Sequence, residues 1–334
     1  MFPELFRIPF TDLTVKSYGT MLVLGLFAGF WLIRKMCAKT GRGANAETLI
    51  NAGMYSLIAG IIGARAMYVL HYRVYEEGFM EIFAVWNGGL ELLGGVILAI
   101  AFILYYLWKK KCDMLTSLDI LSVALLIGIA IGRIGCFLNG CCYGQVTELP
   151  VGVVFPYGSI VYNAQAHPDP LREREEPYID LPANFYGLNT QKGWVPAGEE
   201  NKEKYPLKPK DMLTEAERKL VSRGGPYQAK PVHPTQLYSS AANAVNCLLA
   251  FIFWRRYGSG RENNDKMRCK GCTFSLVFIL YSISRFLVES LRDDNPYEVG
   301  MLTISQLISI GLFAAGVAGL IYYTKRNKAN GLIR

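Results

Sequence analysis

One segment of the sequence, YSISRFLVESLR, combines charged side chains with the spacing of a helix. It contains Tyr281, Arg285, Glu289 and Arg292. Their intervals of four, four and three residues place the four side chains on one stripe of a helix. Glu289 can neutralise only one of the two arginines, and the surplus guanidinium favours an anion whose oxygens match its planar donors, such as a phosphate. The stripe therefore predicts a phosphate site, with a purely structural ladder of ion pairs as the alternative.

A second segment, GRIGCFLNGCCYG, ends a long apolar run and is rich in glycine. Its glycines, of which Gly144 is the last, permit close helix packing followed by a tight turn. Arg133 and Asn139 supply hydrogen-bond donors beside that turn. We therefore predict that Arg133 takes part in catalysis and that Asn139 binds the substrate. Helix packing, with Arg133 directed toward lipid headgroups, is the alternative.

The eight cysteines do not identify a compartment, because several lie inside apolar runs, where a thiol packs like a small apolar group. Cys136, Cys141 and Cys142 belong to the glycine-rich segment. Neighbouring cysteines do not readily bond to each other or provide the tetrahedral spacing of a zinc site. We therefore expect packing or free thiols there, and we predict no metal and no cofactor. Cys269 and Cys272 form an isolated CxxC pair, which we interpret as a labile or incidental thiol pair.

Polar and aromatic side chains also occur near the ends of three other apolar runs. His233 lies in HPTQLY, Arg65 and Tyr68 lie in GARAMYVLHY, and Tyr18 lies near the start of the chain. We predict that His233 takes part in catalysis and that the other three residues bind the substrate. The alternative is an interfacial cluster around His233 and an aromatic belt with Arg65 as an anchor.

These residues are positioned by seven apolar runs, each close to the roughly 20 residues that a helix needs to cross a membrane. The runs cover residues 18–36, 50–71, 88–108, 116–138, 235–254, 273–291 and 301–323. Ionisable groups inside such runs cost several kcal/mol and are therefore candidates for a functional site. The first run is longer than the apolar stretch of a signal peptide, and its basic cluster of Arg34, Lys35 and Lys39 lies at its end, so we expect it to be retained.

Lysine and arginine cluster after the first, third, fifth and seventh runs, whereas the other connections are acidic or neutral. The positive-inside rule then predicts an external N-terminus and a cytoplasmic C-terminus. The net charge of +8 thus reflects membrane orientation and does not indicate a nucleic-acid partner. We predict an all-α polytopic membrane protein, in which spans one to four (1–143) and five to seven (233–334) form one bundle. An external head (144–232) is inserted between them, with a short amphipathic helix expected over 211–223.

Three of the candidate places converge, by chain order, on the outer half of the membrane: Arg133, His233 and the stripe on span six. Their chemistry predicts a lateral pocket that receives the phosphate of an anionic lipid, so the substrate class is a glycerophospholipid. The sequence contains no nucleotide-binding fingerprint or HExxH pair. This agrees with a lipid that itself brings the activated phosphate ester.

Several segments together resemble the prolipoprotein diacylglyceryl transferase family. They are GRIGCFLNGCCYG, GVVFP, HPTQLY, RFLVESLR and LTISQLIS, with SYG near the start and WNGGLELLGGV in span three. The resemblance runs in order through nearly the whole chain except for a head that is longer than is typical. It implies a bacterial inner-membrane enzyme whose active site faces the outer leaflet. Such an enzyme moves the diacylglyceryl group of phosphatidylglycerol to the lipobox cysteine of a prolipoprotein, forming a thioether and releasing glycerol phosphate.

By motif position, the resemblance implies that Arg133 and Arg285 are the essential arginines. It also implies supporting roles for a second set, comprising Tyr18, Asn139, Gly144, Tyr281, Glu289 and Arg292. The sequence departs from the family pattern in span three, where Leu93 stands at a place that often carries histidine or tyrosine. It also has Cys136 where asparagine is common and Cys141 where an acidic residue is common.

The group that removes the thiol proton is open at this point, because Leu93 cannot act as a base. His233, Glu289 and an oxygen of the lipid phosphate are equal candidates. Two other classes of protein are also open. A transporter or channel for anionic lipids or solutes would use arginines inside the membrane, and a membrane thiol oxidoreductase would use the paired cysteines.

Overall fold

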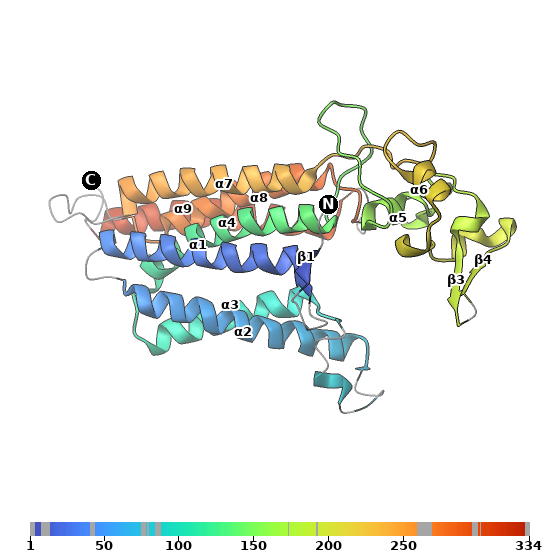
Figure 1. The fold of residues 1–334 in the computed structure, drawn as a ribbon. Helices are drawn as coiled ribbons and strands as arrows, with labels where there is room; N and C mark the ends of the chain where they lie inside the picture. Colours follow the sequence, from blue (N-terminus) through green and yellow to red (C-terminus); the bar gives the residue numbers. More distant parts are fainter. Residues whose placement is uncertain are drawn as a thin grey trace. The chain divides into compact units, whose positions relative to one another are not determined.

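The computed structural model describes residues 4–7, 14–40, 44–74, 78, 80–83, 88–172, 174–191, 193–258, 269–295, 300 and 302–330. Among these residues, seven helices are long and apolar enough to cross a membrane (Figure 1). They are α1 (Ser17–Thr40), α2 (Ala46–His71), α3 (Leu92–Lys109), α4 (Met114–Asn139), α7 (Thr235–Phe253), α8 (Cys272–Glu289) and α9 (Ile304–Ala329); α7 continues as the π-helix η9 (Trp254–Gly258). The seven predicted spans are thus confirmed, and the chain is a mostly helical, multi-pass membrane protein.

The third helix begins later than the sequence predicts. We expected a span from residue 88, but α3 starts at Leu92. Gly88 and Gly89 have φ angles of 86° and 72°, in the left-handed region that glycine adopts readily and a right-handed helix excludes. The two glycines therefore belong to the preceding turn.

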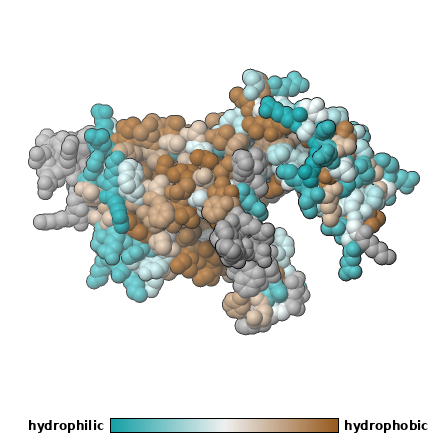
Figure 2. Space-filling view, viewed as in Figure 1, coloured by the Kyte–Doolittle hydropathy of each residue, from teal (hydrophilic) through white to brown (hydrophobic). Residues whose placement is uncertain are grey.

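The surface of the long helices is apolar (Figure 2). Large apolar side chains such as Phe27, Ile97 and Leu248 are between half and two-thirds exposed on α1, α3 and α7. Water-soluble proteins do not expose apolar side chains so continuously, whereas lipid tails solvate them. This surface agrees with the membrane assignment.

The chain forms two compact units. The first contains Met1–Leu26, Leu126–Asn246 and Ile279–Ala314, and the second contains Phe27–Leu125, Cys247–Phe278 and Ala315–Arg334. In the first unit, α1 and α4 approach closely at glycines. A Cβ atom on Gly25 would lie 2.9 Å from the Gly128 carbonyl oxygen, and one on Gly135 would lie 3.0 Å from Met21 Cβ. Small residues permit this close approach of two helices inside a membrane.

The first unit also contains the polar segment 144–232, which has its own aromatic core. Tyr157, Tyr162, Phe185 and Tyr186 are buried there. The tyrosine hydroxyls donate to distant backbone carbonyls, as when Tyr162 Oη donates to the Tyr227 oxygen at 2.6 Å. Burial of aromatic rings with satisfied hydroxyls stabilises this compact segment. That it is an external head is a prediction from the charge pattern.

Short elements complete the first unit. Strands β1 (Glu4–Arg7) and β2 (Thr14–Lys16) are antiparallel, as are β3 (Gly187–Thr190) and β4 (Gly193–Pro196). Two short helices, α5 (Ile160–Gln165) and α6 (Glu215–Val221), lie in the 144–232 segment. Helix α6 lies within the range predicted for an amphipathic helix, and Thr214 and Glu217 form its reciprocal capping box.

In the second unit, α2 and α3 form an antiparallel pair that also packs at glycines. A Cβ atom on Gly63 would lie 2.5 Å from the Gly94 carbonyl oxygen. Asp119 of α4 accepts hydrogen bonds from the backbone N–H groups of Gly271 and Phe274, at 2.8 and 2.7 Å. These contacts satisfy a buried carboxylate at the start of α8. The CxxC pair, Cys269 and Cys272, is joined as a disulfide.

Candidate active site

The charged stripe predicted on span six is present at the end of α8. The Glu289 carboxylate is completely buried and lies between the two arginines. Its Oε2 atom is 2.9 Å from Arg285 Nη1 and 3.3 Å from Arg292 Nη1. Two neutral donors, the Asn295 amide and the Thr303 hydroxyl, bind Oε1. Four partners therefore hold this carboxylate in one position, and it holds both arginines in turn.

Arg285 keeps donor capacity after these contacts. Its Nη2 donates to Ser305 Oγ at 3.0 Å. Its Nη1 is buried and close to Glu289, but makes no hydrogen bond with a described residue. Its contact with Glu289 is therefore an ion pair that leaves N–H donor capacity on Nη1 unused. Arg285 is therefore suited to an additional acceptor, such as a phosphate oxygen.

Arg133 and Tyr281 lie within electrostatic reach of Arg285. Arg133 itself makes no hydrogen bond or ion pair with another residue in the described part of the chain, whereas both terminal atoms of Asp294 bind Arg292 at 2.8 Å. Arg133, Arg285 and Arg292 carry three positive charges. Glu289 and Asp294 carry two negative charges, so one positive charge is left. Asp294 thus neutralises the surplus that the sequence predicted within the stripe, and the excess positive charge belongs to Arg133, which has no carboxylate of its own.

Gly144 is the point at which three predicted segments meet. Its backbone N–H donates to the His233 carbonyl at 3.0 Å, and the next N–H, of Gln145, donates to the Leu291 carbonyl at 2.9 Å. A Cβ atom on Gly144 would lie 2.7 Å from His233 Cβ, Thr235 Cγ2 and the Leu291 oxygen. Only glycine fits this position. It brings the glycine-rich segment between HPTQLY and the end of α8.

The end of α4 turns back on itself directly before Gly144. Gly140 and Cys142 have φ angles of 81° and 59°, and a positive φ is uncommon for a residue other than glycine. Thr235 Oγ1 donates to the Cys142 carbonyl and Gln236 Nε2 to the Cys141 carbonyl, both at 2.7 Å. The turn brings the Sγ atoms of Cys136, Cys141 and Cys142 within 4.8 Å of one another. We expected packing or free thiols here and did not predict that the three Sγ atoms come together.

Two other predicted site residues lie beside this turn. The Asn139 amide contacts the Cys141 thiol. Tyr18, on α1, lies within electrostatic reach of Arg133 and of the three thiols. The first unit therefore brings together side chains from α1, α4 and α8.

Backbone hydrogen bonds hold His233 in the first unit. Its N–H donates to the Gln145 carbonyl at 3.0 Å, which completes the strand-like pairing around Gly144. Its half-buried ring has Nδ1 at 3.3 Å from Tyr238 Oη. One polar partner on the ring leaves the other nitrogen available to a substrate.

Arg65 and Tyr68 lie in the second unit, on α2. The three guanidinium nitrogens of Arg65 all donate to backbone carbonyls, those of Ile82 at 3.1 Å and of Gly88 at 2.7 Å among them. The Arg65 guanidinium also lies 5.3 Å from the centre of the Tyr68 ring. Arg65 thus orders the turn before α3, and substrate binding by this pair stays a prediction.

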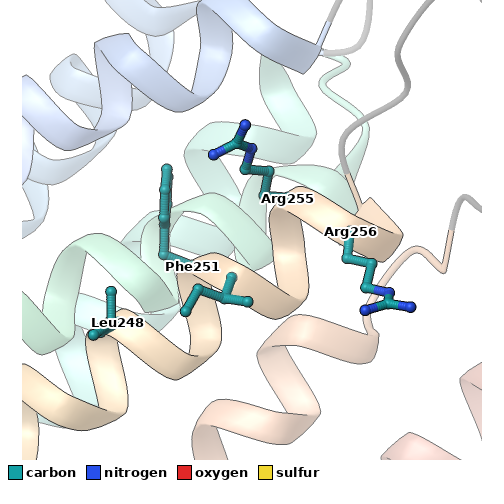
Figure 3. Close-up of a pocket in the computed structure, with 5 residues that line it drawn as sticks. Leu248, Phe251, Arg255 and Arg256 are labelled. Atoms are coloured by element: carbon teal, nitrogen blue, oxygen red, sulfur yellow. The ribbon is translucent and has the colours of Figure 1, made fainter.

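A separate hollow of about 470 Å³ lies along α7 and η9 (Figure 3). It is lined by Leu248, Phe251, Ile252, Arg255 and Arg256. In Figure 3, Phe251 and Arg255 project from the same side of the helix, whereas Arg256 projects from the other. The hollow belongs to the second unit and contains none of the predicted site residues.

Seven apolar helices, with partly buried arginines on α4 and at the end of α8, define a multi-pass membrane protein. A family model described as prolipoprotein diacylglyceryl transferase matches residues 3–322 of the chain. The chain belongs to this family, which is a family of transferases.

Relatives are similar over nearly their full length. One, phosphatidylglycerol–prolipoprotein diacylglyceryl transferase 2 of Clostridium perfringens, is 28% identical over 317 residues, covering 95% of this chain and 93% of the relative. The Clostridium tetani transferase is also 28% identical over 317 residues, covering 95% and 96%. The Burkholderia lata transferase is 26% identical over 329 residues, covering 95% and 94%. The family resemblance predicted from the motifs is confirmed.

Proposed function

We propose that this protein transfers the diacylglyceryl group of phosphatidylglycerol to the lipobox cysteine in the signal peptide of a prolipoprotein. The products are a thioether and glycerol phosphate. Family membership and the names of the relatives support the two substrates. The observation that carries the chemistry is the excess positive charge at Arg133 and Arg285, which suits a phosphate that gains charge during the reaction.

The reaction is a displacement at carbon. The sulfur of the cysteine attacks the glyceryl carbon that carries the phosphate, so a carbon–sulfur bond forms and the carbon–oxygen bond breaks. The electron pair of that bond remains on the phosphate oxygen, which leaves as glycerol phosphate. We assign Arg133 and Arg285 to this phosphate, because fixed guanidinium donors stabilise negative charge as it develops. Glu289 acts as a positioning residue that holds Arg285 and Arg292.

The attacking thiol must lose its proton. Of the two side chains considered as a base, Glu289 already has four partners on its oxygens, whereas the His233 ring has Tyr238. We therefore favour His233 over Glu289 as the acceptor of this proton. Tyr18 lies within electrostatic reach of Arg133, and Tyr281 within reach of Arg285. We assign both tyrosines, together with Asn139 beside the thiol turn, to the lipid headgroup.

We further propose that the chain lies in the bacterial inner membrane with its N-terminus and residues 144–232 outside. Clusters of lysine and arginine follow α1, α3, η9 and α9, and this alternation supports a cytoplasmic C-terminus. Arg133, His233 and Arg292 lie at the helix ends that this orientation assigns to the outer leaflet. A lipid of that leaflet and a secreted precursor would both reach them.

The test uses purified protein, phosphatidylglycerol vesicles and a lipobox peptide with a free cysteine. We expect the peptide to gain the mass of one diacylglyceryl group while glycerol phosphate appears in equal amount. Vesicles of phosphatidylcholine serve as the control for the headgroup. Uptake of lipid without a covalent product would contradict the proposal and favour transport.

A further inference from the structure

We propose that Cys136, Cys141 and Cys142 hold a zinc ion whose fourth coordination position binds the thiol of the substrate cysteine. The role of the fourth position rests on the function proposed above, whereas the metal site rests on the three thiols alone. They are the one group of at least three potential metal-binding side chains of the His, Cys, Asp and Glu types within the described ranges.

The distances fit a zinc ion. The three Sγ atoms lie within 4.8 Å of one another. Tetrahedral zinc with bonds of about 2.3 Å to sulfur requires sulfur atoms roughly 3.8 Å apart. Small rotations of the three side chains would close this difference, since Cys141 and Cys142 lie on a turn and Cys136 on the last turn of α4.

The backbone that brings the thiols together adopts an unfavourable conformation. Cys142 has a φ of 59°, a conformation that costs a residue other than glycine energy and persists where neighbouring contacts enforce it. Thr235 and Gln236 supply such contacts through the Cys142 and Cys141 carbonyls. Gln236 is completely buried. Supporting hydrogen bonds of this kind orient the ligands of metal sites.

The charges also fit. Three thiolates and one zinc ion carry a net charge of −1. Arg292 and Arg133 both lie within electrostatic reach of Cys142 and would offset this charge. Soft thiolate ligands select zinc over magnesium or calcium, and zinc takes no part in redox chemistry. Three protein ligands and one open position are typical of catalytic zinc, whereas structural zinc has four protein ligands.

The open position provides the activation that the reaction needs. A thiol that binds zinc is deprotonated. The lipobox thiol would bind as the fourth ligand, release its proton to His233 and remain a thiolate on the metal. Its sulfur would then form the bond to the glyceryl carbon, and the carbon–oxygen bond to phosphate would break beside Arg133. Zinc keeps its oxidation state throughout.

Metal content tests the site directly. The full-length protein is purified in detergent under reducing conditions and its zinc is measured by mass spectrometry. We expect about one zinc ion per chain. Cys136→Ser and Cys142→Ser should weaken zinc binding by at least about 100-fold, because even lost supporting contacts weaken metal affinity by 10–100-fold. Cys112→Ser, at a half-buried cysteine in the second unit, is the matched control and should keep its zinc.

Cobalt provides a second measurement. Cobalt(II) in place of zinc should show the intense thiolate-to-metal absorption of a tetrahedral sulfur site, and the lipobox peptide should change that spectrum when its thiol binds. The Cys142→Ser protein should lack the absorption. Unchanged zinc content in the two serine variants would overturn the metal site, as would a disulfide between two of the three cysteines in zinc-loaded protein.

Activity separates the two proposals. Full diacylglyceryl transfer by protein freed of zinc with a chelator would overturn the role of the metal and leave the proposed function in place. Zinc bound through the three cysteines without transfer would support the metal site and overturn its role in transfer together with the proposed function. Loss of transfer on chelation and its return with added zinc would support both.

Discussion

At the residue scale, the two arginines of the site differ in their partners. Arg285 uses one nitrogen for Ser305 and presents another to Glu289, while Arg133 makes no hydrogen bond or ion pair to a residue that the structure describes. A guanidinium can bind a neighbour and a phosphate oxygen simultaneously through its planar donors. A lysine ammonium offers a single point charge on a flexible stem. The geometry thus favours arginine over lysine for binding a phosphate at these two positions.

We predict that Arg285→Lys and Arg133→Lys each lower kcat/KM for diacylglyceryl transfer by about 10- to 100-fold, because each loses charge-assisted hydrogen bonds worth roughly 1.5–3 kcal/mol. Initial rates with phosphatidylglycerol vesicles and a lipobox peptide measure this. Arg256→Lys, in the hollow along α7, is the matched control and should leave the rate unchanged. Wild-type rates in both site variants would remove the basis for a phosphate clamp.

Glu289 has a different function, since its carboxylate has four partners and no exposed surface. Removal of one partner of a buried ion pair typically costs about 3–5 kcal/mol, because it leaves the other charges uncompensated. We predict that Glu289→Gln lowers the free energy of unfolding by about 3 kcal/mol, measured as a fall in thermal midpoint in detergent.

The control for this change is Glu199→Gln. The Glu199 carboxylate is 72% exposed in its contact with Lys202, and its loss should change stability by less than about 1 kcal/mol. The residual transfer activity of Glu289→Gln should keep the wild-type pH profile, since a positioning residue does not exchange the proton. A pH profile that loses one limb would instead show that Glu289 is the base.

At the element scale, the ends of α4, α7 and α8 are joined by the backbone around Gly144. No side chain fits there, since three atoms, including the Leu291 carbonyl oxygen, lie 2.7 Å from the Cβ position. We predict that Gly144→Ala destabilises the protein by about 1–3 kcal/mol, as overpacking does, and also lowers transfer activity by displacing the thiol turn and Arg292. Thermal unfolding and initial rates check both effects.

Gly311→Ala is the matched control. Gly311 lies inside α9 with no atom within 4 Å of its Cβ position. An alanine there should be neutral or should stabilise the helix by up to about 1 kcal/mol. If the two alanine variants unfold alike, the close pairing around Gly144 does not limit stability.

The sequence predicts those elements that are determined by residues close together in the chain. Hydropathy over about 20 residues marks each spanning helix, and Thr214 with Glu217 marks the start of α6. The core of residues 144–232 was not predicted, because contacts such as that between Tyr162 and Tyr227 join positions 65 residues apart. Such pairs leave no periodic pattern in the sequence.

The same distinction applies to the site. The stripe of Arg285, Glu289 and Arg292 was predicted because residues three and four apart share one face of a helix. The proximity of the three thiols was not predicted, because it depends on two left-handed residues and on hydrogen bonds from residues more than 90 positions later. Gly140, directly after α4, was the sequence signal for this turn, because a glycine at that position commonly ends a helix and reverses the chain.

At the scale of the whole molecule, the protein must present both substrates to one side of the membrane. On the proposed function, a lipobox cysteine in a secreted precursor meets the phosphate of a lipid only if the helix ends around Gly144 face the compartment that both substrates reach. The basic clusters after α1, α3, η9 and α9 supply the orientation through the positive-inside rule. This orientation predicts that the polar segment 144–232, which begins at Gly144 and ends directly before His233, is external.

We predict that a specific protease site inserted in the β3–β4 turn is cleaved in right-side-out vesicles, because that turn lies in the polar segment. The same site placed after Arg334, ahead of an epitope tag, should resist the protease there and be cleaved only in inverted vesicles. Immunoblots of both variants in both vesicle types measure this. Loss of the C-terminal tag from right-side-out vesicles would reverse the topology and place the arginines on the side where no secreted precursor arrives.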